Sequence, residues 1–319
     1  MRVFYYDIIS LVIVMDDIVS KIAKLNIDLF GENPIINKIN VGFTNTIYSV
    51  NNLYIIKICS NINNEDKFKK EIIFYKANKD NKLIPKLFVG STSKAEVPYM
   101  YEILEKVEGT SLYNVWHTLN EEERENIVKK ICDAMRLFHS IKGKFYNWFE
   151  RTCDIFNKAY YTVKELGIFD IEEVKLIDNA YNNFHLYLDA NEFVLIHNDL
   201  HFDNIIYNNG KIKLIDFERS IYAPSDFELD ILYRMVRKPW KFASEEAEKY
   251  VRKEDYSNIM NYIKKYYPEI MNIPNLYIRL AIYDMVYFMK QLVEYPHIKE
   301  LKEDILSAAK IVGDIDGIY

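Results

Sequence analysis

The chain has 319 residues, of which 50% are hydrophobic and 28% are charged, so it can bury a substantial core in one large domain or in two lobes. It contains only nine glycines. Neither a G-x-G nor a G-x-x-x-x-G-K pattern occurs, which excludes a dinucleotide fingerprint, a protein-kinase-type glycine loop and a Walker A loop. The net charge of -6 disfavours a general binder of nucleic acid and suits a cationic substrate.

Cysteine and histidine usage points away from disulfide and zinc sites. The three cysteines form no C-x-x-C pair, and although His197 and His201 stand four residues apart, no H-E-x-x-H pattern occurs. This cysteine usage is typical of a reducing cytoplasm, so we expect a cytoplasmic protein. The apolar run over residues 8–15 is too short to span a membrane. We expect it to add a strand or helix to the first lobe, or to reflect an overlong start.

The first hundred residues predict mostly β-structure. Residues 46–50 and 53–58 are expected to form a hairpin that turns at Asn51 and Asn52, because asparagine tolerates the positive φ of a two-residue turn. A helix is predicted over residues 64–78. Two more strands are predicted over residues 87–89 and 98–104.

After Gly109 the pattern becomes helical. The run Asn120-Glu-Glu-Glu is typical of a helix start, and apolar residues then recur at helical spacing up to Ile141. Further helices are predicted over residues 154–166 and 170–190.

An island of β-structure interrupts these helices. A strand is predicted over residues 193–196, and a hairpin over residues 205–215 that turns at residues 208–210. Beyond residue 225 the pattern is helical, and its breaks fall at four prolines: Pro239, Pro268, Pro274 and Pro296.

The segment around this island carries the chemistry. His197-x-Asp199 is followed five residues later by Asn204, and Asp216 ends an apolar strand. Phosphoryl transfer needs a carboxylate to accept the substrate's hydroxyl proton, and oxygen ligands that hold Mg²⁺. We therefore predict Asp199 as the base and Asn204 and Asp216 as the ligands of Mg²⁺.

The pattern H-x-D-x-x-x-x-N followed by I-D-F resembles the catalytic core of the aminoglycoside phosphotransferase and choline kinase families, which share the protein-kinase-like fold. The phrase Ile215-Asp-Phe-Glu218 carries glutamate where protein kinases have glycine, and in this it resembles the small-molecule kinases. The resemblance implies an α+β, two-lobed fold with a small β-rich lobe over residues 1–103 and a larger, mostly helical lobe over residues 104–319. It also implies that His197 supports the catalytic loop and that His201 borders the substrate.

A lysine and a glutamate upstream fit the same machinery. Lys57 lies on the face of its strand opposite to that of Ile56 and Ile58. The resemblance implies that this lysine holds the α- and β-phosphates. The alternative is an edge-strand lysine that discourages aggregation. Glu71 shares an apolar stripe with Phe68 and Tyr75, so we expect it to face inward and pair with Lys57. The competitor, Glu65, sits in the first helical turn and would serve the helix dipole.

Residues 40–49 resemble the phosphate-covering loop of the same kinases, with Val41 in place of the first glycine. The resemblance implies that the backbone at Gly42 and the Thr44 hydroxyl cap a phosphate. An ordinary hairpin turn is the alternative interpretation.

Residues 99–109 resemble the hinge between the two lobes of these kinases. The resemblance implies that an adenine forms hydrogen bonds with the backbone between Glu102 and Leu104. It also implies that Met100 lines the back of the adenine pocket.

Acids and aromatic residues supply candidates for the substrate side. On a helix Asp226 and Asp230 share a face, while Glu228 points elsewhere. These acids would complement a helix dipole or form an acidic wall for an amine-bearing substrate, and the resemblance implies an aspartate here that ties down the catalytic loop. Trp148, Trp240 and the tyrosines of residues 275–295 would add aromatic faces for a cation.

The resemblance implies Mg²⁺-dependent transfer of the γ-phosphoryl group of ATP or GTP to a hydroxyl of an aminoglycoside-like substrate, an activity that confers antibiotic resistance. A choline, amino-sugar or other metabolite kinase is the alternative. A non-catalytic nucleotide-binding scaffold and a protein kinase are further alternatives. The sequence leaves the acceptor open, because substrate identity lies in the pocket of the helical lobe, where no motif stands.

Overall fold

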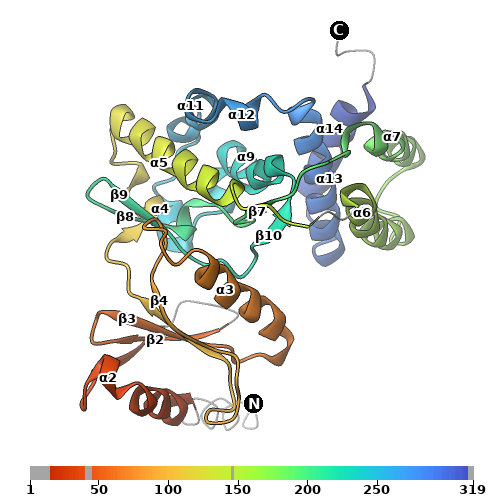
Figure 1. Cartoon of the computed structure of the whole chain (residues 1–319). Coiled ribbons are helices and arrows are strands. Elements are labelled where there is room, and N and C mark those ends of the chain that lie inside the picture. Colours follow the sequence, from red (N-terminus) through yellow and green to blue (C-terminus); the bar gives the residue numbers. More distant parts are fainter. Residues whose placement is uncertain (1–14, 40–44, 145–146, 315–319) are drawn as a thin grey trace. The chain divides into compact units, whose positions relative to one another are not determined.

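The computed structural model describes residues 15–39, 45–144 and 147–314 (Figure 1). The chain divides into two compact units. Unit 1 consists of Met1–Thr110 and Ile205–Arg219, and unit 2 of Ser111–Asn204 and Ser220–Tyr319. This division differs from the expected boundary after residue 103, because residues 101–105 form one strand inside the sheet of unit 1.

Unit 1 is built on an antiparallel sheet of five strands. They are ordered β1 (Ile36–Ile39), β2 (Thr46–Val50), β3 (Tyr54–Ile58), β5 (Tyr101–Glu105) and β4 (Leu87–Ser91). The predicted β2–β3 hairpin is confirmed. Asn51 and Asn52 adopt φ values of 52° and 56°, and the Leu53 N–H donates to the Val50 carbonyl at 3.0 Å.

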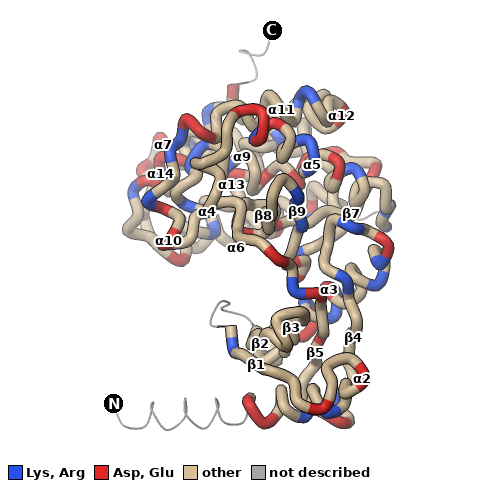
Figure 2. The backbone as a smooth tube through the Cα atoms, turned by 90° about the vertical axis from the view of Figure 1, so that its left-hand side faces the viewer, with Lys and Arg blue, Asp and Glu red and all other residues tan. Residues whose placement is uncertain are grey.

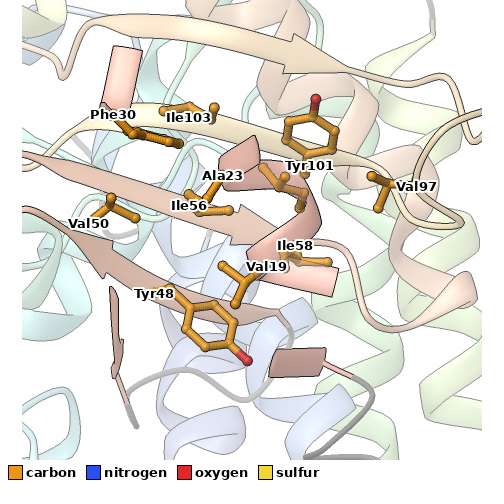
Figure 3. Close-up of a cluster of buried hydrophobic side chains, with 11 residues drawn as sticks. Val19, Ala23, Phe30, Tyr48, Val50, Ile56, Ile58, Val97, Tyr101 and Ile103 are labelled. Carbon is orange, nitrogen blue, oxygen red and sulfur yellow. The ribbon is translucent and has the colours of Figure 1, made fainter. Parts of the chain in front are cut away.

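One face of this sheet is covered by helical residues 15–25 and by α2 (Ile27–Phe30) (Figure 3). Val19 and Ala23 of the first helix pack in the same cluster as Ile56 and Ile58 of β3. Because side chains alternate along a strand, Lys57 must lie on the other face. There it meets α3 (Glu65–Ala77), which η1 (Ile62–Asn64) precedes.

A second hairpin also belongs to unit 1. It consists of β8 (Ile205–Asn208) and β9 (Lys211–Leu214), and the predicted turn at Asn209 and Gly210 is confirmed by φ values of 46° and 80°. The Leu214 N–H donates to the carbonyl of Leu83 at 2.8 Å. Gly109 has φ +132°, and a Cβ there would lie 2.3 Å from the Tyr207 carbonyl oxygen, so glycine is required at this approach.

Unit 2 is mostly helical. Its helix α5 (Glu121–His139) starts with the predicted capping box, in which the Glu123 N–H donates to Asn120 at 3.0 Å and the Asn120 N–H donates back to Glu123 at 2.8 Å. The helix expected over residues 154–166 begins earlier, where Asn147 caps it through the Glu150 N–H at 3.0 Å. After β6 (Thr110–Ser111), where the chain passes into unit 2, the first helices are α4 (Leu112–Trp116), α5 (Glu121–His139), α6 (Trp148–Glu165), α7 (Ile171–Asn182) and α8 (Phe184–Tyr187).

A two-stranded sheet lies within unit 2. The predicted strand is β7 (Val194–Ile196), and it pairs antiparallel with β10 (Ile221–Ala223), a strand the sequence did not predict. The short helix η2 (Phe202–Asn204) follows β7, and η3 (Ser225–Glu228) follows β10. Together these elements carry the segment in which the catalytic pattern was found.

The remainder of unit 2 is helical, as expected. Pro239 and Pro268 open η4 (Pro239–Lys241) and α12 (Pro268–Met271), while Pro274 and Pro296 flank α13 (Leu276–Glu294). None of the described helices combines the length and apolar character needed to cross a bilayer. Acidic and basic residues are interspersed along α7 and α14 (Figure 2). The elements are α9 (Leu229–Arg237), η4 (Pro239–Lys241), α10 (Glu245–Glu248), η5 (Lys253–Tyr256), α11 (Ile259–Tyr266), α12 (Pro268–Met271), α13 (Leu276–Glu294) and α14 (Lys299–Gly313).

Candidate active site

Lys57 is a buried lysine held between two carboxylates. Its Nζ lies 2.7 Å from Oε2 of Glu71 and 3.2 Å from Oδ1 of Asp216. Burial lowers the pKa of Lys57, but the charges of Glu71 and Asp216 raise it above the ordinary value. The side chain is therefore a fixed positive charge, as a group that binds phosphate must be.

Glu71 reaches Lys57 because α3 turns its apolar stripe inward. Phe68, Glu71 and Tyr75 on this stripe are each only 1% exposed, as the spacing predicted. The competing Glu65 pairs with Lys94 instead. Of the two glutamates, the structure therefore brings Glu71 to the lysine.

Aromatic packing holds Asp216 beside this pair. The ring of Phe217 stacks on Phe74 of α3, with 3.9 Å between the ring centroids and 14° between the planes. The same ring meets Tyr75 edge-on at 5.5 Å. Asp216 itself has φ 65°, a left-handed backbone that is costly for a residue other than glycine and is characteristic of functional sites.

A cluster of oxygen ligands surrounds Asp216. Glu71, Asp216 and Glu218 each offer a carboxylate oxygen, and these oxygens lie within 4.8 Å of one another. The Asn45 amide donates to Glu218 Oε2 at 3.2 Å, which orients that carboxylate. Hard oxygen donors in this number suit a small divalent cation, so the residues fit the metal that the sequence predicted.

Glu102 does not lie where the sequence placed it. It is fully buried in β5, directly opposite Lys57 on β3, and neither carboxyl oxygen has a hydrogen-bond partner among the described residues. Burial, followed by the charge of Glu71, raises the pKa of Glu102 well above its ordinary value. Burial therefore favours the protonated form of this acid beside the lysine.

The expected adenine contact with the backbone between Glu102 and Leu104 is corrected by the same strand. β5 pairs with β3 on one side and with β4 on the other, so its peptide groups are occupied by the sheet. Met100 packs against Phe68 and Ile72 in a hydrophobic cluster, which gives it a role in the core. The phosphate-capping residues Gly42 and Thr44 lie outside the described residues.

In unit 2 the catalytic loop is closed by short hydrogen bonds. Asn198, with φ 61°, precedes Asp199. The Asn204 amide nitrogen lies 2.8 Å from the Asp199 carbonyl and 3.2 Å from His201 Nε2. His201 Nε2 is also 4.0 Å from Asp199 Oδ1. Asn204 therefore uses its amide nitrogen within the loop, and its oxygen is the atom with the chemistry of a cation ligand.

Glu228 supports this loop, a role that the sequence interpretation missed. Its carboxylate accepts hydrogen bonds from the backbone N–H of His197 at 2.8 Å and of Asn198 at 3.2 Å. His139 Nε2 lies 3.6 Å away. Burial raises the pKa of Glu228, but the interactions with His139 and His197 outweigh it and hold the pKa below the ordinary value. A glutamate between Phe227 and the buried Leu229 was the available signal.

The expected acidic wall is absent from the described part of unit 2. Asp226 is 1% exposed and forms a two-pronged ion pair with Arg279 of α13, at 2.7 and 2.9 Å. Asp230 is 8% exposed and pairs with Arg234, with 2.6 Å between Oδ2 and Nη2. Both acids are buried because each balances a buried arginine, so neither presents its charge to a ligand.

The two tryptophans expected to offer aromatic faces to a cation differ in their exposure to solvent. Trp148 is 2% exposed, and its indole N–H donates to the Tyr283 hydroxyl at 3.2 Å. Tyr283 in turn donates to Asp226 at 2.9 Å. Trp240 is 40% exposed.

The predicted residues thus fall into two groups, one in each unit. Unit 1 assembles four of them around the lysine, and unit 2 assembles the catalytic loop. The first group is Lys57, Glu71, Asp216 and Glu218; the second is His197, Asp199, His201 and Asn204.

Most of the chain matches the model of a known protein family. The model of the phosphotransferase enzyme family matches residues 35–257. No curated protein sequence matches the chain.

Several solved structures are similar. The ADP-bound aminoglycoside phosphotransferase APH(2'')-Ib has 17% identity and a TM-score of 0.65 over 93% of this chain and 98% of that one. The gentamicin complex of APH(2'')-IIa has 16% identity and a TM-score of 0.62 over 93% and 95%. A thermostable APH(4)-Ia mutant with ADP and hygromycin B has 17% identity and a TM-score of 0.57 over 93% and 99%. At these identities the likeness establishes the two-lobed, protein-kinase-like fold.

Proposed function

Because the chain belongs to the phosphotransferase enzyme family, whose model matches residues 35–257, we propose that it transfers the γ-phosphoryl group of ATP or GTP to a hydroxyl of a small molecule. The observation that carries the proposal is Lys57, buried at 2.7 Å from Glu71 and 3.2 Å from Asp216. A lysine placed in this way fixes a phosphate-binding charge next to a potential metal ligand.

The nucleotide side of the reaction is assigned to unit 1. Lys57 binds the α- and β-phosphates, and Glu71 keeps its side chain in place. Asp216, with Asn204 from the catalytic loop, would hold Mg²⁺, and the cluster with Glu218 supports an oxygen-rich site. When bound, Mg²⁺ neutralises charge that builds up on the phosphate oxygens.

The acceptor side is assigned to Asp199. This carboxylate accepts the proton of the attacking hydroxyl, or orients that hydroxyl toward the phosphate. The bonds from Asn204 to the Asp199 carbonyl, and from His197 and Asn198 to Glu228, hold the loop in one conformation. A base that is already positioned has little conformational freedom to lose on reaching the transition state.

Three acceptor classes enter the test. Aminoglycosides come first, because two of the similar structures contain gentamicin and hygromycin B. Choline and amino sugars follow. Each carries a hydroxyl that Asp199 can deprotonate, and each carries positive charge.

The proposal is tested by the thermal midpoint of unfolding with ATP or GTP, in the presence and absence of Mg²⁺. We expect metal-dependent stabilisation, because a ligand that binds the folded state raises its stability. A screen for nucleotide consumption over the acceptor classes then follows. A nucleotide that stabilises the protein equally with and without metal, and no consumption, would instead favour a non-catalytic scaffold.

A further inference from the structure

A cavity of about 230 Å³ lies within unit 2, between α9, η4, α13 and α14. Phe242, just after η4, lines one side of it. The ring of Phe242 is 6.4 Å from the ring of His201, which in turn lies 4.0 Å from the Asp199 carboxylate. One residue of the cavity lining therefore lies next to the loop that carries the proposed base.

Basic residues dominate the charged lining of this cavity. Arg234, Arg237, Lys238 and Lys241 line it, whereas Asp304 is the one acidic residue in the lining. Arg237 and Lys241 are the most accessible of the four, with side chains 39% and 34% exposed. A ligand that enters the cavity therefore meets mainly positive charge.

The carboxylates that balance these cations differ in position. Asp284, which pairs with Arg234 and Arg237, has a side chain that is only 4% exposed. Asp230 is 10% exposed behind Arg234, and Glu300, which pairs with Lys238 and Lys241, does not line the cavity. Lys238 also pairs with Asp304, the acid of the lining, at 2.6 Å, so the lining cations whose acid partners lie outside the lining are Arg234, Arg237 and Lys241.

Two of the lining cations have N–H donors that are not used in hydrogen bonds among the described residues. Among the described residues, Arg237 donates from Nε to the Tyr233 carbonyl and from Nη2 to Asp284, so Nη1 has no acceptor. Lys241 uses one of its three N–H groups, on Glu300. These donors suit a carboxylate or phosphate oxygen.

The aromatic walls are already used by cations of the protein. The Arg234 guanidinium lies 3.9 Å from the ring centre of Tyr287, and Lys238 Nζ lies 5.8 Å from that of Phe288. An incoming ammonium group would compete with these cations for the same ring faces and would be repelled by them.

We propose that this cavity binds the anionic group of the phosphoryl acceptor, so that the substrate is a small hydroxyl compound carrying a carboxylate or phosphate. The inference rests on the proposed kinase function and replaces the cationic acceptor classes named above with an anionic one. Arg237 and Lys241 bind the anion, and Phe242 with Phe288 contacts the carbon skeleton. Because the cavity adjoins His201, the hydroxyl of such a compound is directed toward Asp199.

The test uses matched acceptors that share one skeleton: glucuronate, glucose 6-phosphate, glucose and glucosamine, with kanamycin as a polycation. Binding to the protein loaded with Mg²⁺ and a non-hydrolysable ATP analogue is measured by calorimetry, and phosphoryl transfer is measured with ATP. We expect glucuronate or glucose 6-phosphate to bind more tightly than glucose, and glucosamine to bind more weakly. The two anionic compounds distinguish a carboxylate from a phosphate ligand.

Single substitutions test whether the lining cations bind the anion. Lys241→Gln is expected to weaken binding of the preferred anion about tenfold, the equivalent of one charge-assisted hydrogen bond, and to leave glucose unaffected. Arg237→Gln should act more strongly, but it also removes a partner of the buried Asp284, so its folding is checked by circular dichroism. The matched control is Lys253→Gln, an exposed lysine outside the cavity lining.

The outcomes separate the inference from the function on which it rests. Glucosamine or kanamycin binding more tightly than the anions, or anions binding no better than glucose, would overturn the anionic acceptor while leaving the kinase intact. Loss of anion binding in Lys253→Gln equal to that in Lys241→Gln would also overturn it. Failure of Mg²⁺ and ATP to bind the wild-type protein would instead contradict the proposed function.

Discussion

At the scale of single residues, the environment of Lys57 explains why its charge persists inside unit 1. Glu71 and Asp216 lie within 3.2 Å of the ammonium, and the buried Glu102 faces it from the next strand. A buried lysine without such partners would lose its proton. The surrounding acids, more than the lysine itself, therefore make the position suitable for binding phosphate.

Glu102→Gln tests the buried acid. The folded-state pKa of Glu102 is raised, so folding is unpenalised below the unfolded pKa of about 4.3 and becomes costlier as pH rises above it. Glutamine cannot ionise. We expect the thermal midpoint of the variant, measured relative to that of the wild type, to rise between pH 5 and pH 8. The exposed control Glu96→Gln should show no such trend. A difference that stays constant with pH would show that Glu102 is ionised.

Glu228→Gln tests the support of the catalytic loop. The folded-state pKa of Glu228 is lowered, so its contribution is present above the unfolded pKa and is lost as pH falls through the folded pKa. At pH 7 the variant should lose about 1.5–3 kcal/mol of unfolding free energy in urea, because a charged acceptor is replaced by a neutral one. Glu246→Gln, an exposed glutamate, should lose none. Equal stability of the two variants would contradict the role assigned to Glu228.

At the scale of elements, the ion pair between η3 and α13 determines where the acids point. Arg279 binds Asp226 through two hydrogen bonds and also donates to Tyr283 at 3.2 Å. The acids that looked available as a substrate wall are needed to balance arginines inside unit 2. Neither acid is therefore available to a ligand as a free charge.

Arg279→Met measures this contact. Removing the arginine leaves Asp226 buried without its counter-ion, which should cost about 3–5 kcal/mol in a urea unfolding experiment. The matched control is Lys175→Met, because Lys175 and Glu172 form a surface pair with side chains 66% and 80% exposed. We expect the control to unfold near the wild-type midpoint. A loss in Arg279→Met no larger than in the control would refute the pairing.

Elements defined by local chemistry could be predicted from the sequence. Both hairpins were foreseen because asparagine and glycine tolerate the positive φ of their turns, and α5 because its capping box is local. β10 was missed because three residues become a strand only by pairing with β7. The expected helix over residues 170–190 divides into α7 and α8 around Asn183, whose amide donates to the Val312 carbonyl, a contact distant in sequence.

The candidate site followed the same rule. Local sequence patterns predicted Lys57, Glu71 and Asp216, because the spacing of neighbouring residues shows which face of a strand or helix each one occupies. The roles of Glu228 and Glu102 were not, since one depends on backbone donors 30 residues away and the other on strand pairing. The arginines that neutralise Asp226 and Asp230 are likewise visible only in the folded chain.

At the scale of the whole molecule, the proposed reaction draws on both units. Unit 1 supplies the charge that binds the nucleotide, and unit 2 supplies the base and the acceptor cavity. Each unit holds its own group of residues through internal contacts. The central claim is therefore that these two groups act together as a metal-dependent kinase with Asp199 as the base.

The most direct test is turnover by Asp199→Asn, compared with the wild type on the best acceptor. The asparagine keeps the size of the side chain but cannot accept the hydroxyl proton. We expect a fall in kcat of at least about a hundredfold, with Mg²⁺-ATP binding and the circular dichroism spectrum unchanged. Near wild-type turnover in a folded, nucleotide-binding Asp199→Asn variant would contradict the account.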